Sequence, residues 1–179
     1  MKKFTLTETT KEFFGITLYQ IKATRSFNDI AEGELGGWVE KEDNLDHDGD
    51  AWVSGDAQVY GNARVYGNAR VYGNARVYGN AWVHDNARVY GDAQVQTRKH
   101  IAWFSSIGSE NGTLTAYTIK NGEIEVARGC FRGSLEKFEN AVKQRHGDSR
   151  YGQEYRLLIQ FIKLRFSEIT VSESEGKEE

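Results

Sequence analysis

Apolar side chains recur with a period of six residues through the middle of the chain. Every sixth residue from Ala51 to Ala93 is alanine, and every sixth residue from Val53 to Val95 is valine. Side chains two residues apart on a strand point to the same face, so each Ala-x-Val unit turns one small and one branched side chain toward a common interior. The residues on either side of each valine are expected to point outward.

Turn-forming residues separate these short strands. The hexad Gly-Asn-Ala-Arg-Val-Tyr is repeated unchanged over 61–66, 67–72 and 73–78, and glycine and asparagine both tolerate the left-handed backbone that a sharp turn requires. Three hexads would form one triangular coil of about 18 residues, and stacked coils supply each other's core. A disordered low-complexity repeat is the alternative, but it would not keep every valine in phase.

The pattern resembles the hexapeptide-repeat family, whose members fold as left-handed parallel β-helices and usually assemble as trimers. The resemblance implies such a β-helix over residues 39–96, and it specifies the fold far better than the function. Val39 and Leu45 fall in the alanine register and Lys41 and His47 in the valine register. We therefore expect residues 39–50 to form two degenerate entry hexads.

The segment 1–38 is expected to be an N-terminal β cap. Residues 2–8 and 16–25 alternate well enough to form two strands, and Phe27 and Trp38 are large enough to cover the first open rung. The stretch from Leu18-Tyr19-Gln20-Ile21 through Phe27-Asn28-Asp29 to Gly36-Gly37-Trp38-Val39 resembles the entry to bacterial and prophage hexapeptide proteins that are often labelled transferases.

Residues 97–167 are expected to form a small α+β module, followed by a disordered acidic tail over 168–179. Three strands are predicted over 101–105, 113–120 and 123–127, with a turn at Asn121-Gly122. Two helices are predicted over 135–146, with Ser134 as N-cap and Gly147 as terminator, and over 151–166. The module resembles C-terminal modules of phage and prophage proteins in the motifs Gly129-Cys130-Phe131, Gly133-Ser134-Leu135, Phe138, His146-Gly147 and Glu154-Tyr155.

Composition and charge narrow the class of protein. The net charge of −3 is not that of a duplex nucleic-acid binder, and a single cysteine, Cys130, fits a reducing compartment. No stretch is apolar enough for a signal peptide or a membrane span. We expect a soluble cytoplasmic protein of the host cell in which Cys130 is a buried structural residue.

The sequence contains few candidate catalytic residues. Acyltransferases of the resembling family use a histidine base, and His84 or His47 could serve as one, with acyl-CoA as the donor. The repeat runs without the interrupting loop that such enzymes often carry, however, and the histidines lack the spacing of a zinc site. Cys130 precedes one predicted helix and His146 lies at the far end of the same helix, so the two residues are not expected to pair. We therefore expect no catalytic residue, metal or cofactor.

The outward positions of the repeat are rich in arginine and aromatic residues, which are enriched at protein interfaces. With 18 residues per coil, these side chains should stack in rows on three faces, where arginine can also clamp phosphates and aromatic rings can stack on bases. The residues predicted to form a trimer interface or to bind a ligand are Trp52, Arg64, Arg70, Arg76, Trp82, His84, Arg88, Tyr60, Tyr66, Tyr72, Tyr78 and Tyr90.

The leading functional hypothesis is a non-enzymatic, homotrimeric binding or assembly protein of phage or prophage origin. One form of it is a host-defence antagonist that sequesters a defence protein or a small nucleotide or other phosphorylated signal. The alternatives are an acyl-CoA-dependent acyltransferase and a structural virion component.

Overall fold

The computed structural model describes residues 2–172, which divide into two compact units. The first unit ends at Arg98 and combines the N-terminal strands with the repeat, and the second begins at Lys99. Within the described residues, the helices are too short or too polar to cross a bilayer.

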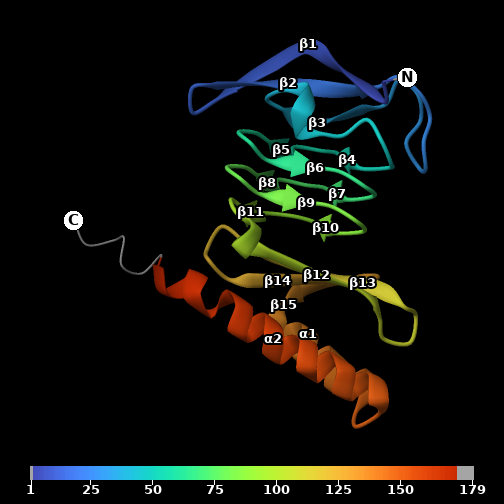
Figure 1. Cartoon of the computed structure of the whole chain (residues 1–179), viewed down its shortest axis with the longest axis vertical. Helices are drawn as coiled ribbons and strands as arrows, with labels where there is room; N and C mark the ends of the chain where they lie inside the picture. The colour runs from blue at the N-terminus through green and yellow to red at the C-terminus, as the bar shows by residue number, and fades with distance from the viewer. Residues whose placement is uncertain (1, 173–179) are drawn as a thin grey trace. The chain divides into compact units, whose positions relative to one another are not determined.

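The repeat folds as a β-solenoid of about three turns, with coils stacked on one another (Figure 1). Each hexad contributes a two-residue strand made of the outward residue and its valine, and strands three hexads apart pair in parallel. The strands are β4 (Trp52–Val53), β5 (Gln58–Val59), β6 (Arg64–Val65), β7 (Arg70–Val71), β8 (Arg76–Val77), β9 (Trp82–Val83), β10 (Arg88–Val89) and β11 (Gln94–Val95).

The interior of the solenoid contains the predicted residues. Every alanine and valine of the hexads from 51 to 95 is at most 1 % exposed. The corners are made by glycines with positive φ, such as Gly73 at 70°, and by ladders of asparagine and aspartate, such as Asn62 Nδ2 donating to Asn80 Oδ1 at 3.3 Å. The prediction of a β-helix repeat is therefore confirmed.

The entry to the solenoid differs from the predicted register. Val39 pairs with Val59, and Leu45 pairs with Val65. The partners in both pairs are 20 residues apart, two more than the 18 residues between Val53 and Val71. Val39 and Leu45 thus occupy valine positions, and Lys41 and His47 do not. The physical reason is that a branched apolar side chain gains more from the interior than lysine or histidine does, so the chain inserts two residues before Ala51.

The N-terminal segment is built around three strands, β1 (Phe4–Phe13), β2 (Ile16–Ala23) and β3 (Leu35–Val39), with the short helix η1 (Glu42–Asn44) after them. β1 and β2 form an antiparallel hairpin, and β3 joins β2 to β5 in the sheet β1-β2-β3-β5-β8-β11 (Figure 1). Gly36 and Gly37 allow this approach, since a Cβ at Gly36 would lie 2.7 Å from the Trp52 ring.

The two aromatic residues expected to cover the first rung have different roles. Phe27 is buried and its ring packs edge-on against Trp52 at 5.4 Å. Trp38 is instead an outward residue of β3, paired with Gln58 and covered by the Lys11 ammonium at 4.2 Å. The predicted covering role of Trp38 is wrong, because Val39, its neighbour, takes the inward position.

The short helix η2 (Arg98–His100) includes the last residue of the first unit and the first two residues of the second. The second unit contains one antiparallel sheet and two α-helices. The sheet order is β12-β13-β14-β15, and its elements are β12 (Ile101–Ile107), β13 (Gly112–Thr118), β14 (Ile124–Arg128), β15 (Phe131–Ser134), α1 (Leu135–His146) and α2 (Arg150–Ser172). Leu114, Ala116 and Val126 of the sheet share one core with Phe138 of α1 and Ile159 of α2.

Several local predictions for this unit hold. The first helix spans the predicted residues, and Ser134 Oγ accepts a hydrogen bond from the Lys137 amide as its N-cap. The second helix is longer than predicted, because residues 167–172 continue it to Ser172 and Ile169 still packs in the core at 6 % exposure. The expectation of a tail starting at 168 is therefore wrong, and residues 173–179 lie outside the described residues.

Candidate functional site

The outward side chains of the solenoid stack in rows, as the 18-residue spacing predicts. Tyr72 lies on Tyr90 with ring centroids 4.9 Å apart, and Tyr66 lies on His84 at 4.6 Å. Tyr60 and Tyr78 stack in the same way at 5.2 Å. The structure therefore assembles the predicted residues into continuous aromatic and arginine rows, but the three faces differ in what covers them.

The face of β4, β7 and β10 is partly covered by the N-terminal segment. Trp52 is fully buried, with Phe4 and Phe27 against its ring. Arg70 is 4 % exposed and forms an ion pair with Asp29. The expectation that Trp52 and Arg70 are presented outward for a partner is wrong, because the loop after β2 folds over them, whereas Arg88 is exposed.

The face of β5, β8 and β11 is also partly covered. The ring of Phe13, at the end of β1, lies 5.7 Å from the Tyr60 ring. The Arg76 guanidinium stacks over the Phe13 ring, 4.5 Å from its centre. Burial raises the pKa of Tyr60 above its usual value. Tyr60 and Arg76 are thus in contact with the hairpin of their own chain.

The face of β6 and β9 has a different environment. Arg64 is exposed, and Tyr66, Trp82 and His84 are each partly exposed. The Arg98 guanidinium lies 3.4 Å from the centre of the Trp82 ring, a close cation–π contact. An open hollow lies at the edge of this face and is lined by Lys41, Asp43, Asn62, Ala63 and Arg64.

The two histidines considered as catalytic bases have different surroundings. Both ring nitrogens of His47 are engaged, since Nδ1 accepts a hydrogen bond from the Lys3 amide at 3.1 Å and Nε2 lies 2.6 Å from a Glu42 carboxylate oxygen. Hydrogen bonds from Lys2 and His47 lower the pKa of Glu42. His84 stacks on Tyr66, and its Nδ1 lies 3.1 Å from Asp85 Oδ2. Because the Lys3 amide and Glu42 occupy both of its ring nitrogens, His47 is part of the packing between the N-terminal segment and the start of the solenoid.

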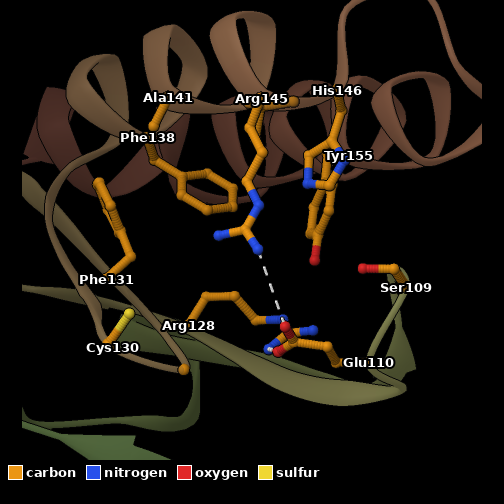
Figure 2. A pocket seen from close by; sticks show the side chains of 12 residues that line it. Ser109, Glu110, Arg128, Cys130, Phe131, Phe138, Ala141, Arg145, His146 and Tyr155 are labelled. Carbon is orange, nitrogen blue, oxygen red and sulfur yellow. Dashed lines mark ion pairs between the residues drawn. The ribbon is translucent and has the colours of Figure 1, made fainter.

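The second unit contains a cavity of about 160 Å³ between the helices and the sheet (Figure 2). Charged and apolar side chains share its wall, and the apolar part is provided by Phe131, Phe138, Ala141 and Val142. The remaining lining residues are Ser109, Glu110, Arg128, Gly129, Cys130, Arg145, His146 and Tyr155.

Cys130 is exposed in the turn between β14 and β15. The expectation of a buried structural cysteine is therefore wrong, because the β14–β15 connection is so tight that its turn residues remain at the surface. Cys130 and His146 line the same cavity, although they stand on different parts of its wall (Figure 2).

Sequence reasoning did not select Arg128, Arg145, Glu110 or Tyr155 as site residues. A signal was nevertheless present, since the motif residues Gly129-Cys130-Phe131, Phe138, His146 and Tyr155 that carry the resemblance to phage modules all line this cavity. Among residues 2–172, no three His, Cys, Asp or Glu side chains gather as a metal site would require.

Comparisons with known proteins bear on the repeat alone. A family model described as "YdcK Beta solenoid repeat" matches residues 57–72 and 69–85. No curated protein matches the chain at a significant level. The match and the stacked coils together show a β-helix repeat protein.

Proposed function

We propose that this protein is a non-enzymatic binding or assembly protein that forms homotrimers through the β6–β9 face of its solenoid. The observation that supports this proposal is the unequal covering of the three faces. Trp52 and Arg70 are buried by the N-terminal segment, whereas Arg64 is exposed beside partly exposed Tyr66 and Trp82. Arginine and large aromatic residues dominate interface energetics when a partner excludes water from them.

The solenoid in this proposal is a left-handed β-helix of the hexapeptide type, and the chain is of phage or prophage origin. The six-residue faces and the repeated Gly-Asn-Ala-x-Val unit support the first statement, and the resemblance of both flanks to phage proteins supports the second. The partner is a host defence protein or a small phosphorylated ligand that the assembled arginines would hold. Acyl transfer and a virion role remain alternatives without a specific structural observation in their favour.

Native mass spectrometry of the full chain purified from host extract tests the assembly and its cargo together, because it reports stoichiometry and bound small molecules in one measurement. The matched variants are Arg64→Glu and Arg88→Glu, which make the same change at the same hexad position on two different faces. Both side chains are exposed. We expect Arg64→Glu to weaken the trimer at least ~10-fold, corresponding to the loss of one hot-spot residue, and Arg88→Glu to change it less than ~3-fold.

A parent protein that remains monomeric at micromolar concentration would contradict the proposal. Equal loss of trimer in both variants would show that the interface is not confined to the β6–β9 face. Circular dichroism melting of both variants serves as the control for folding, since exposed positions of this kind seldom change stability by more than ~0.5 kcal/mol.

A further inference from the structure

The cavity of the second unit combines two arginines with an apolar wall, and the function proposed for the solenoid does not use it. Arg145 comes from the last turn of α1 and Arg128 from the end of β14, and both face the same space (Figure 2). Phe131 and Phe138, with ring centroids 5.1 Å apart, form the apolar side. Pockets of this composition, apolar with a few convergent charged groups, are typical of small-molecule sites.

The Arg128 guanidinium is fixed by one hydrogen bond and still has an N–H group without an acceptor in the part of the chain that the structure describes. Its side chain is 11 % exposed, and Nη2 donates to the Ile107 carbonyl oxygen at 3.1 Å. Its buried Nε has no hydrogen-bond partner among the described residues. A buried guanidinium donor without a partner is costly, so Arg128 has donor groups that hydrogen bonds within the described part of the protein do not fully satisfy.

Two glycines make room for the polar side of the cavity. A Cβ at Gly112 would lie 2.5 Å from Arg128 Nη1, and a Cβ at Gly108 would lie 2.1 Å from the Tyr155 hydroxyl oxygen. Tyr155 is 4 % exposed, and its hydroxyl points toward the turn between β12 and β13 (Figure 2). Gly112 at the start of β13 thus leaves room for the Arg128 side chain, and Gly108 in the turn leaves room for Tyr155.

A carboxylate of the chain itself already lies between the two arginines. Glu110, in the β12–β13 turn, has one carboxylate oxygen 3.8 Å from Arg128 Nη1 and the other 3.9 Å from Arg145 Nη2 (Figure 2). These separations are too long for hydrogen bonds, so the arginine donors are not used up. Glu110 is 66 % exposed, so little holds it against replacement by a better-fitting anion.

We propose that this cavity binds a small organic carboxylate with a compact apolar body, whose carboxylate displaces Glu110 from Arg128 and Arg145. The apolar body lies against Phe131, Phe138 and Val142. The volume suits such a ligand, because an apolar protein cavity of about 150 Å³ accommodates benzene. The carboxylate is favoured over phosphate because the position between the arginines already holds one carboxylate of the chain.

Benzoate is the probe, and the comparators are acetate, which lacks the apolar body, benzyl alcohol, which lacks the carboxylate, and inorganic phosphate, which is an anion that lacks both. The full chain is titrated with each compound and followed by ¹H–¹⁵N chemical shifts, with the amides of Gly108, Gly112 and Gly129 reporting the site. We expect benzoate to bind with a dissociation constant on the order of 1 mM. The three comparators are expected to bind at least ~5-fold more weakly, since each loses either the charge-assisted bonds or the apolar contact.

Variants of exposed residues test the roles of Arg145 and Glu110 in benzoate binding without disturbing the core. Arg145 is 72 % exposed, so Arg145→Gln is expected to fold and to weaken benzoate binding at least ~5-fold. Glu110→Gln removes the competing carboxylate and is expected to tighten binding ~2–5-fold. Lys143→Gln, on the same helix with the same charge change but outside the cavity wall, is the matched control and is expected to change binding less than ~1.5-fold.

If benzoate does not shift the three glycine amides, the proposal is overturned. If Lys143→Gln weakens benzoate binding as much as Arg145→Gln does, the protein attracts anions non-specifically and the proposal is also overturned. Phosphate binding more tightly than benzoate overturns the assigned ligand class. Ala141→Leu, which fills the apolar side without changing charge, should abolish benzoate shifts at Gly108 and Gly112, and unchanged shifts would place the ligand elsewhere.

Discussion

Lys3 Nζ donates a hydrogen bond to the carbonyl oxygen of Ala51 at 2.8 Å, and this bond joins the residue before β1 to the first complete coil of the solenoid. Lys3 is fully buried, and its ammonium also reaches the Gly49 carbonyl oxygen at 3.3 Å. Three backbone carbonyls near the start of the coil thus share one lysine, since Asp48 O lies 3.5 Å away.

Lys3 should make stability depend on alkaline pH. Burial lowers its pKa from 10.5 to about 8, so between these values the unfolded chain binds more protons than the folded one, and the free energy of unfolding rises with pH. We expect a gain of about 1–2 kcal/mol between pH 7 and pH 9.5 in urea denaturation. In Lys3→Met this gain should be absent, and an equal gain in the variant would assign it to another group.

Asp29 should stabilise the loop that covers Trp52 through its ion pair with Arg70. Arg70 is buried, and its Nη1 already lacks a hydrogen-bond partner among the described residues. Asp29→Asn leaves the buried guanidinium without its counter-ion and should cost about 1–3 kcal/mol, less than a fully buried pair because Asp29 is exposed. Asp56→Asn, at an exposed solenoid corner, is the control. Hydrogen exchange should become faster in residues 24–35 of the first variant alone.

Val71 should be intolerant of charge because it lies in the middle of the stacked interior. It pairs with Val53 on one side and Val89 on the other and is fully buried. Val71→Asp places an unpaired carboxylate among apolar side chains and should destabilise by several kcal/mol, on the order of 3–5. Arg64→Asp, at an exposed position of the same repeat, should shift the thermal midpoint far less. Equal melting of the two variants would show that the inward register is wrong.

His47 and His84 should respond differently to removal. His47→Ala loses the stacking on Phe4 at 4.4 Å and the hydrogen bond from the Lys3 amide, so we expect a cost of about 1–3 kcal/mol. His84→Ala, on the outer row beside Tyr66, should cost less than ~1 kcal/mol in the monomer. Neither variant is expected to lose biological activity, because neither histidine belongs to a recognisable catalytic set. A loss beyond about 100-fold in turnover of an acyl-CoA with folding unchanged, which corresponds to ~2.7 kcal/mol, would support the acyltransferase alternative.

The sequence by itself determined the repeating part of this protein. A six-residue period with alanine and valine in phase has few solutions, because only a coil with flat faces and sharp corners buries both residues in every repeat. The N-cap at Ser134, the turn at Asn121-Gly122 and the span of α1 also follow from local chemistry, in which a side chain bonds its own neighbouring backbone or glycine takes a positive φ.

Tertiary structure alone decided which outward residues stay accessible and where a cavity forms. Nothing in the hexads distinguishes Arg70 from Arg64, yet the first is buried by a loop that is distant in sequence and the second is exposed. Likewise Arg128 and Arg145 lie on a strand and a helix whose packing brings them to one cavity. The period of a repeat reports only the direction of a side chain relative to its own coil. Burial and charge clustering depend on which distant segments pack against it, and local pattern does not encode that packing.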